Sequence, residues 1–273
     1  MVFDRASQHA LAVVSALLFV ASAAVTIAWC TSMSAMGGMP MPGGWTMSMA
    51  WMRMPGQTWA GAAGSFLGMW IAMMVAMMLP SLAPMLRRYR QAVGGRGGTR
   101  PDVLTAIVGV SYFFVWIVFG MVVFPLGVTL AEVEMRQPAL ARAVPLAVGV
   151  IVLIAGAVQF SSWKARHLAC CREGPASVPG SGGGGAGRDT LPADSGSAWR
   201  YGLRLGLHCS QCCAGPMTIL LVAGVMDLRA MAVVTAAMAV ERLAPAGEHL
   251  ARTFGTVTVV AGVLLIAQAA GLR

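Results

Sequence analysis

Charged residues are scarce in this chain of 273 residues. Asp, Glu, Lys and Arg make up 11% of it, whereas a soluble domain contains roughly 25%. Hydrophobic residues make up 58%, and several apolar runs reach the length of about 20 residues that a helix needs to cross the hydrocarbon core of a membrane. The composition therefore predicts one all-α domain over residues 1–273, a polytopic transmembrane bundle that has the lipid bilayer as its first partner.

Motifs for nucleotide or hydrolytic chemistry are also missing. The sequence has no G-x-x-x-x-G-K-[ST], G-x-S-x-G or H-E-x-x-H pattern, which would indicate phosphate binding, a serine nucleophile or a zinc hydrolase. The formal net charge of +9 does not indicate nucleic acid, because the basic residues flank apolar runs and have no aromatic platform beside them. We therefore expect no nucleic-acid partner, no nucleotide-driven pump and no catalytic residues.

The distribution of basic residues predicts the topology. Seven apolar segments are expected to span the membrane: 10–29, 65–86, 103–130, 143–163, 200–226, 229–243 and 253–270. Cytoplasmic loops are enriched in Lys and Arg. With the amino terminus in the cytoplasm and the carboxyl terminus outside, 14 of the 19 basic residues are cytoplasmic, and five are external: Arg53, Arg136, Arg142, Arg229 and Arg273. We expect this bundle in the inner (cytoplasmic) membrane of a bacterium.

Proline and glycine mark the expected ends and loops. Pro80 and Pro84 are predicted near the end of the second span, and Pro125 at a kink or end of the third. Residues 31–64 are predicted as an external Met-rich loop, and residues 173–198 as a flexible Gly-rich cytoplasmic linker. The first span has a possible signal-cleavage site at Ala21-Ser22-Ala23, but its apolar run continues past this site, which favours a retained helix.

Five of the six cysteines fall in two clusters, each beside a histidine. On a helix, the side chains of His208, Cys209, Cys212 and Cys213 would share one face within an arc of about 140°, and those at 167, 170 and 171 an arc of about 100°. Both clusters are expected at cytoplasmic ends of spans, where thiolate and imidazole ligands suit Cu(I), zinc or an iron–sulfur cluster. The predicted metal ligands are His167, Cys170, Cys171, His208, Cys209, Cys212 and Cys213.

Methionine favours copper among these metals. Eight of the 22 residues from Met33 to Met54 are methionine, and a thioether selects Cu(I) but hardly engages zinc. The alternatives are adaptable packing between helices and an apolar surface that lies on lipid or on a partner. The predicted soft-metal relay comprises Met36, Met39, Met41, Met47, Met49, Met69, Met73 and Met77.

Glu241 is a carboxylate near the cytoplasmic end of the sixth predicted span. It could pair with Arg242, reach water, or orient a metal ligand from outside the coordination shell.

Several short motifs extend over most of the chain, from about Trp45 to Gly247. They are Trp70-Ile71-Ala72-Met73-Met74-Val75-Ala76-Met77-Met78-Leu79-Pro80-Ser81, Gln159 with Lys164, Cys171-Arg172, Cys209-x-x-Cys212-Cys213, Gly224-Val225-Met226, and Glu241-Arg242 with Pro245 and Gly247. In these motifs the chain resembles a bacterial family of uncharacterised proteins described as predicted metal-binding integral membrane proteins. The resemblance implies membrane location and metal binding. The family pattern is K-x-x-C-L-x-x-C-R, and this chain has His167 in place of its first cysteine.

These patterns together predict a non-enzymatic protein that binds, delivers or transports a soft metal. A metallochaperone or a larger membrane complex would be its protein partner. Two alternatives stay open. One is a membrane thiol oxidoreductase that uses Cys209-x-x-Cys212 as its dithiol, and the other is an accessory subunit of a larger complex.

Overall fold

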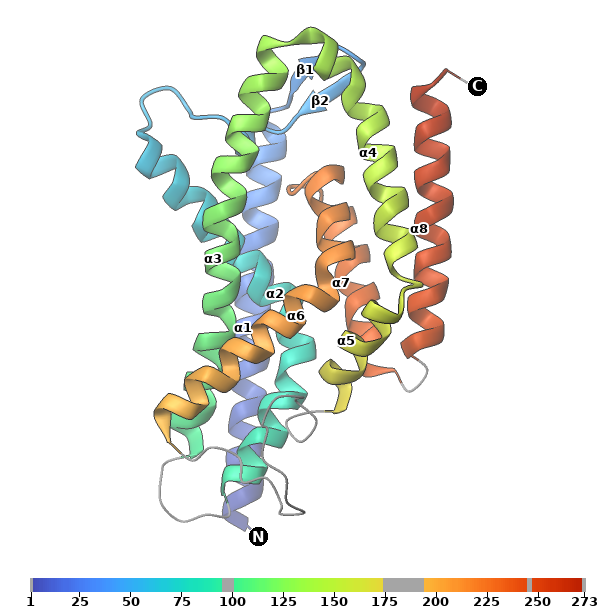
Figure 1. Cartoon of the computed structure of the whole chain (residues 1–273). Helices are drawn as coiled ribbons and strands as arrows, with labels where there is room; N and C mark the ends of the chain where they lie inside the picture. The colour runs from blue at the N-terminus through green and yellow to red at the C-terminus, as the bar shows by residue number, and fades with distance from the viewer. Residues whose placement is uncertain (1, 95–100, 174–193, 245–246, 272–273) are drawn as a thin grey trace.

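Long helices dominate the computed structural model, which describes residues 2–94, 101–173, 194–244 and 247–271. Six helices are long and apolar enough to cross a membrane (Figure 1). They are α1 (Val2–Ala35), α2 (Trp59–Gly94), α3 (Pro101–Arg136), α4 (Pro138–Val158), α6 (Ser195–Ala223) and α8 (Gly247–Ala269). The predicted all-α class is confirmed. The predicted sixth span corresponds to α7 (Leu228–Leu243), which has 16 residues and is shorter than those six.

Two helices continue through the prolines that were expected to end or kink them. Pro80 and Pro84 lie inside α2, and Pro125 lies inside α3. A proline removes one backbone hydrogen bond, but helices packed against neighbours tolerate this loss when side chains satisfy the freed groups. The helix therefore continues to Gly94, beyond the predicted end of the second span near Pro80 and Pro84.

The fourth predicted span is divided in the structure. α4 begins at Pro138 and ends at Val158, residues 159–161 form a turn, and α5 (Ser162–Glu173) follows as a separate helix. Cys170 and Cys171 lie on α5, but their side chains are outside the described part of the structure, as is most of the predicted linker at 173–198. The predicted metal-binding motif is thus carried by a short helix of its own and does not extend α4.

The Met-rich segment has more structure than the predicted loop. Strands β1 (Met39–Met41) and β2 (Trp45–Met47) form an antiparallel hairpin, followed by the short helix η1 (Met49–Trp51). Trp45 Nε1 donates to the Ala141 carbonyl at 2.9 Å, and Met41 and Met47 are buried beside Ala131 and Ala141. The hairpin therefore packs on the connection between α3 and α4.

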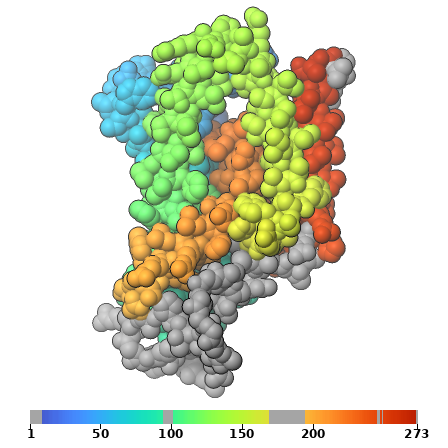
Figure 2. All heavy atoms as spheres, in the orientation of Figure 1, coloured from blue at the N-terminus to red at the C-terminus, as the bar shows by residue number. Residues whose placement is uncertain are grey.

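Glycines allow the outer helices to approach closely. A Cβ on Gly262 of α8 would lie 2.6 Å from the backbone nitrogen of Leu153 in α4, and a Cβ on Gly202 of α6 would lie 2.5 Å from the carbonyl of Val108 in α3. Small residues at such crossings are typical of helix packing in membranes. Figure 2 shows α3, α4 and α8 on one face of the molecule; α6 begins on the same face below α3, and its later part lies between α3 and α4. The core between α2, α3, α6 and α7 contains Cys209 and Cys213 of the candidate site.

Candidate metal site

The α6 helix directs its cysteines toward two different neighbours. Cys209 and Cys213 are 2% and 1% exposed and belong to the main core, which also contains α2 and α7. Cys212, also 2% exposed, packs instead with Leu168 of α5 and Ala251 of α8. The helical arc of about 140° predicted from the sequence is wide enough for the cysteines of α6 to face different neighbouring helices. The two sides remain adjacent, because Cys212 and Cys213 are consecutive residues of α6.

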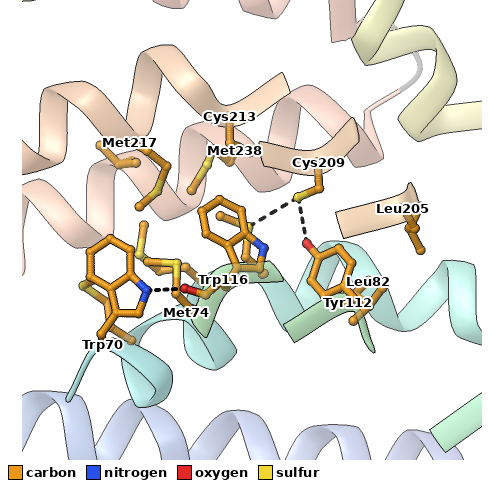
Figure 3. Packing of buried hydrophobic residues seen from close by; sticks show 14 of the residues in the cluster. Trp70, Met74, Leu82, Tyr112, Trp116, Leu205, Cys209, Cys213, Met217 and Met238 are labelled. Atoms are coloured by element: carbon orange, nitrogen blue, oxygen red, sulfur yellow. Dashed lines mark hydrogen bonds between the residues drawn. The ribbon is translucent and has the colours of Figure 1, made fainter. Parts of the chain in front are cut away.

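Methionines of α2 face the first pair of thiols. Met69, Met73, Met74, Met77 and Met78 are 0–4% exposed and lie in the same core cluster as Cys209 and Cys213. α6 and α7 add Met217 and Met238, and Figure 3 shows these side chains gathered around the cysteines. The Cys209 thiol donates to Met78 Sδ at 3.9 Å. We call Cys209, Cys213, Met74, Met78, Met217 and Met238 the inner sulfur cluster.

Two polar side chains contact the inner sulfur cluster. The Tyr112 hydroxyl of α3 lies 2.7 Å from Cys209 Sγ. One nitrogen of Arg242, Nη2, donates to both Cys209 Sγ at 3.0 Å and Cys213 Sγ at 2.7 Å, while Nη1 donates to the Ser81 hydroxyl at 2.9 Å. A guanidinium group therefore bridges the two thiols. A bound cation that used both sulfurs would have to displace these two hydrogen bonds.

On the other side of α6, one histidine of this helix meets one histidine of α5. The rings of His167 on α5 and His208 on α6 lie 5.8 Å apart between centroids, and Trp163 contacts His167 edge-on at 4.7 Å. Burial and the nearby His208 lower the pKa of His167, which favours the neutral imidazole that binds metals. His208 Nδ1 is buried and has no hydrogen-bond partner among the described residues. Such an atom is available to a ligand.

Lys164 joins the two sides of the site. Its ammonium donates to Glu241 Oε2 at 2.9 Å and to the Cys212 carbonyl at 2.8 Å. Burial alone would lower the pKa of Lys164, but Cys212 and Glu241 raise this pKa above its ordinary value, so the ammonium stays charged. Glu241 is thus paired with Lys164 of α5, and its Oε1 atom is buried without a hydrogen-bond partner in the described structure.

Some predicted ligands are not brought together. Within the described residues, no group of three or more His, Cys, Asp or Glu side chains is arranged to hold a metal ion. The predicted relay is divided among three places. Its α2 members, Met69, Met73 and Met77, are buried in the main core, and its hairpin members Met41 and Met47 are buried against α3 and α4. Met36 is 51% exposed. Met39 packs beside the hairpin cluster.

Sequence reasoning missed the roles of Arg242, Tyr112 and Lys164. An ionisable residue within a membrane helix is expensive and often functional, so Arg242 and Lys164 could have been identified on that ground. Tyr112 carried no such signal, since it is one of several aromatic residues in an apolar span.

One comparison with known proteins gave a match. A family model described as "PpoB2: Copper chaperone" matches residues 67–265. This stretch runs from within α2 into α8 and includes the inner sulfur cluster, α5 and Arg242, but it leaves out α1 and the hairpin. Searches of curated proteins and of solved structures found no match.

Proposed function

Because this chain belongs to the PpoB2 copper chaperone family, we propose that it is a multi-pass membrane protein that binds Cu(I) at the inner sulfur cluster and passes it on. Cys209, Cys213 and Met78 would be the primary ligands. Cys212, His167 and His208 would form a neighbouring ligand group on the α5 side, through which copper leaves. Cys170 and Cys171 belong to the same proposed group by sequence.

The observation that carries the proposal is the spacing of the sulfur atoms. A metal with metal–sulfur bonds of about 2.3 Å, as zinc has, separates its sulfur ligands by about 3.8–4.0 Å in tetrahedral or trigonal geometry. Cys209 Sγ and Met78 Sδ are 3.9 Å apart, and Cys209 Sγ and Cys213 Sγ both lie within 3.0 Å of the same nitrogen of Arg242. Thiol and thioether sulfur together favour Cu(I) over harder cations.

Burial of the cluster supports binding and handover over redox catalysis. Cys209 and Cys212 pack against different neighbours, and each is 2% exposed. A dithiol that exchanges with protein substrates needs an accessible attacking thiol. The oxidoreductase alternative therefore has less support from the geometry than copper binding.

Copper content measures the proposed site directly. The purified protein in detergent would be loaded anaerobically with Cu(I), and bound copper counted after removal of excess metal. Cys209→Ser with Cys213→Ser is expected to lose the copper held by the inner sulfur cluster, because serine oxygen is a hard, weakly acidic donor. Ser210→Ala on the same helix is the matched control. Equal copper in the double variant and wild type would overturn the proposal.

A further inference from the structure

A cavity of about 520 Å³ lies beside the hairpin, whose strand β2 is among the elements that line it. Its wall is formed by the end of α1, the hairpin, η1 and the turn between α6 and α7. Four of its lining residues are methionines that come from separate elements: Met33, Met47, Met49 and Met226. The cavity thus brings together thioethers that are up to 193 positions apart in the chain.

Behind this wall lies a buried thiol. Cys30 of α1 is 0% exposed, and its Sγ donates to Met226 Sδ at 3.9 Å. This separation equals that of Cys209 and Met78 and suits two sulfur atoms that share one metal ion. Met226 both lines the cavity and contacts Cys30. A soft cation in the cavity would therefore meet thioethers first and a thiol directly behind them.

The carboxylate at the cavity is already engaged. Asp227 accepts hydrogen bonds from the backbone nitrogens of Arg229 and Ala230 as the amino-terminal cap of α7. Hard cations such as Mg²⁺ or Ca²⁺ take six or more oxygen ligands, whereas the side-chain oxygens at this wall are those of Ser34, Thr46, Ser48 and Asp227, of which only Asp227 is a carboxylate. The donor set favours Cu(I) or Ag(I).

We propose that this cavity is a second soft-metal site, in which Met33, Met49, Met226 and Cys30 receive Cu(I) before it reaches the inner sulfur cluster. Thioethers bind without losing a proton, so they suit an entrance. Cys30 belongs to the same core cluster as Met69 and Met73 of α2 and as Cys209 and Cys213 of α6, so sulfur groups continue from the cavity into the core. The inference rests on the proposed copper function. Three of the cavity methionines, Met33, Met47 and Met49, precede the region matched by the family model.

Silver counting tests this site separately from the inner one. Ag(I) is a soft cation without redox chemistry, and native mass spectrometry of the detergent-purified chain would count the ions bound. Met33, Met49 and Met226 would be changed together to leucine, a swap that conserves volume and is usually well tolerated. We expect this triple variant to lose one Ag(I) relative to wild type and to keep the ion bound at Cys209 and Cys213.

Three further measurements complete the design. Cys30→Ser is expected to lower the affinity of the cavity for Ag(I) on the order of tenfold or more. Met121→Leu, which changes a methionine that is 48% exposed on α3, should lose no silver and is the matched control. If the triple variant binds as much Ag(I) as wild type, the cavity site is wrong and the inner site is unaffected. If the Cys209→Ser, Cys213→Ser variant binds as much Ag(I) as wild type while the triple variant loses one ion, the inner site is wrong and the cavity site stands.

Discussion

Lys164 and Glu241 form an ion pair that is almost completely removed from solvent, with side chains 4% and 3% exposed. Lys164 also bonds to the carbonyl of Cys212, so the pair connects α5 and α7 to the turn of α6 that carries the thiols. A buried pair adds little net stability compared with apolar residues, but the loss of one partner leaves an uncompensated charge. The pair therefore fixes how these three helices meet.

Breaking this pair from one side should destabilise the protein strongly. Lys164→Met leaves the Glu241 carboxylate without its counter-ion, and we expect the free energy of unfolding to fall by about 3–5 kcal/mol. Thermal unfolding in detergent would show this as a lower Tm. The double variant Lys164→Met, Glu241→Met should recover most of the loss. A double variant as unstable as the sum of both single changes would contradict the role assigned to the pair.

The proposed ligand residues were easier to identify from the sequence than the groups that contact them. Cys209 and Cys213 are conspicuous in the sequence because free thiols gather in few places, and their spacing on a helix is fixed. Arg242 lies 29 positions after Cys213, and no local pattern indicates that its guanidinium bridges both thiols. This contact depends on how α7 packs against α6, which is a tertiary property. The pairing of Glu241 with Lys164 could not be predicted for the same reason.

At the scale of single elements, the crossing of α6 over α3 positions Cys209. Gly202 and Gly206 of α6 lie against α3, and Tyr112 of α3 contacts Cys209 one to two turns further along. A Cβ on Gly202 would lie 1.9 Å from Ser111 Oγ and 2.5 Å from the Val108 carbonyl. The hydroxyl can rotate away, but the carbonyl belongs to the helix backbone. Any side chain at this position must push the two helices apart.

Gly202→Ala is therefore expected to weaken both stability and copper binding. Overpacking of this kind costs about 1–3 kcal/mol, and the shift of α6 should loosen the contact between Tyr112 and Cys209. Tm and Cu(I) content would be measured together. Gly64→Ala in α2 is the control, because its Cβ would meet no atom within 4 Å and alanine favours the helix. Unchanged Tm and copper content in Gly202→Ala would refute the role of this crossing.

Helices were predicted well from apolar runs, whereas their ends were not. Pro80 and Pro84 are ordinary helix breakers in water, yet α2 continues through both because neighbouring helices hold it. The break after Val158 carries no proline or glycine at residues 159–161, so nothing local separates α4 from α5. The hairpin was missed because its methionines and glycines resemble a loop, although Gly43 and Gly44 adopt the positive φ that its turn requires.

Across the whole molecule, sulfur chemistry differs between the two ends. The cavity at the hairpin end is lined by thioethers, whereas α5 at the other end carries a histidine and two cysteines. Thiols persist in a reducing cytoplasm, and thioethers need no such protection outside. The predicted orientation, with the hairpin outside and α5 in the cytoplasm, would match each ligand type to its compartment.

The path of α7 explains why a count of long helices differs from the predicted seven spans. α7 begins at the cavity and ends where Glu241 meets Lys164 of α5, so it returns the chain along the bundle. Its 16 residues cover about 24 Å as a helix, which is somewhat less than the hydrocarbon thickness of about 30 Å. With α7, seven of the described helices run along the bundle, and Figure 1 shows the start of α1 and the end of α8 toward opposite ends.

This path yields a prediction about sidedness. Thr46 in β2 and Ser195 at the start of α6 are exposed and lie toward opposite ends of the molecule (Figure 1). A membrane-impermeant maleimide should label Thr46→Cys in cells whose inner membrane is intact, and Ser195→Cys only after that membrane is opened.

The native cysteines need a control in this experiment. Four of them are only 0–2% exposed and should react little: Cys30, Cys209, Cys212 and Cys213. The other two, Cys170 and Cys171, would be replaced by serine in both variants and in a control without a new cysteine. The positive-inside bias places Arg200 and Arg204 beside Ser195 in the cytoplasm, because moving such charges across the membrane is unfavourable. Labelling of Ser195→Cys from outside, with Thr46→Cys protected, would reverse the orientation and assign the thioether cavity to the cytoplasmic side.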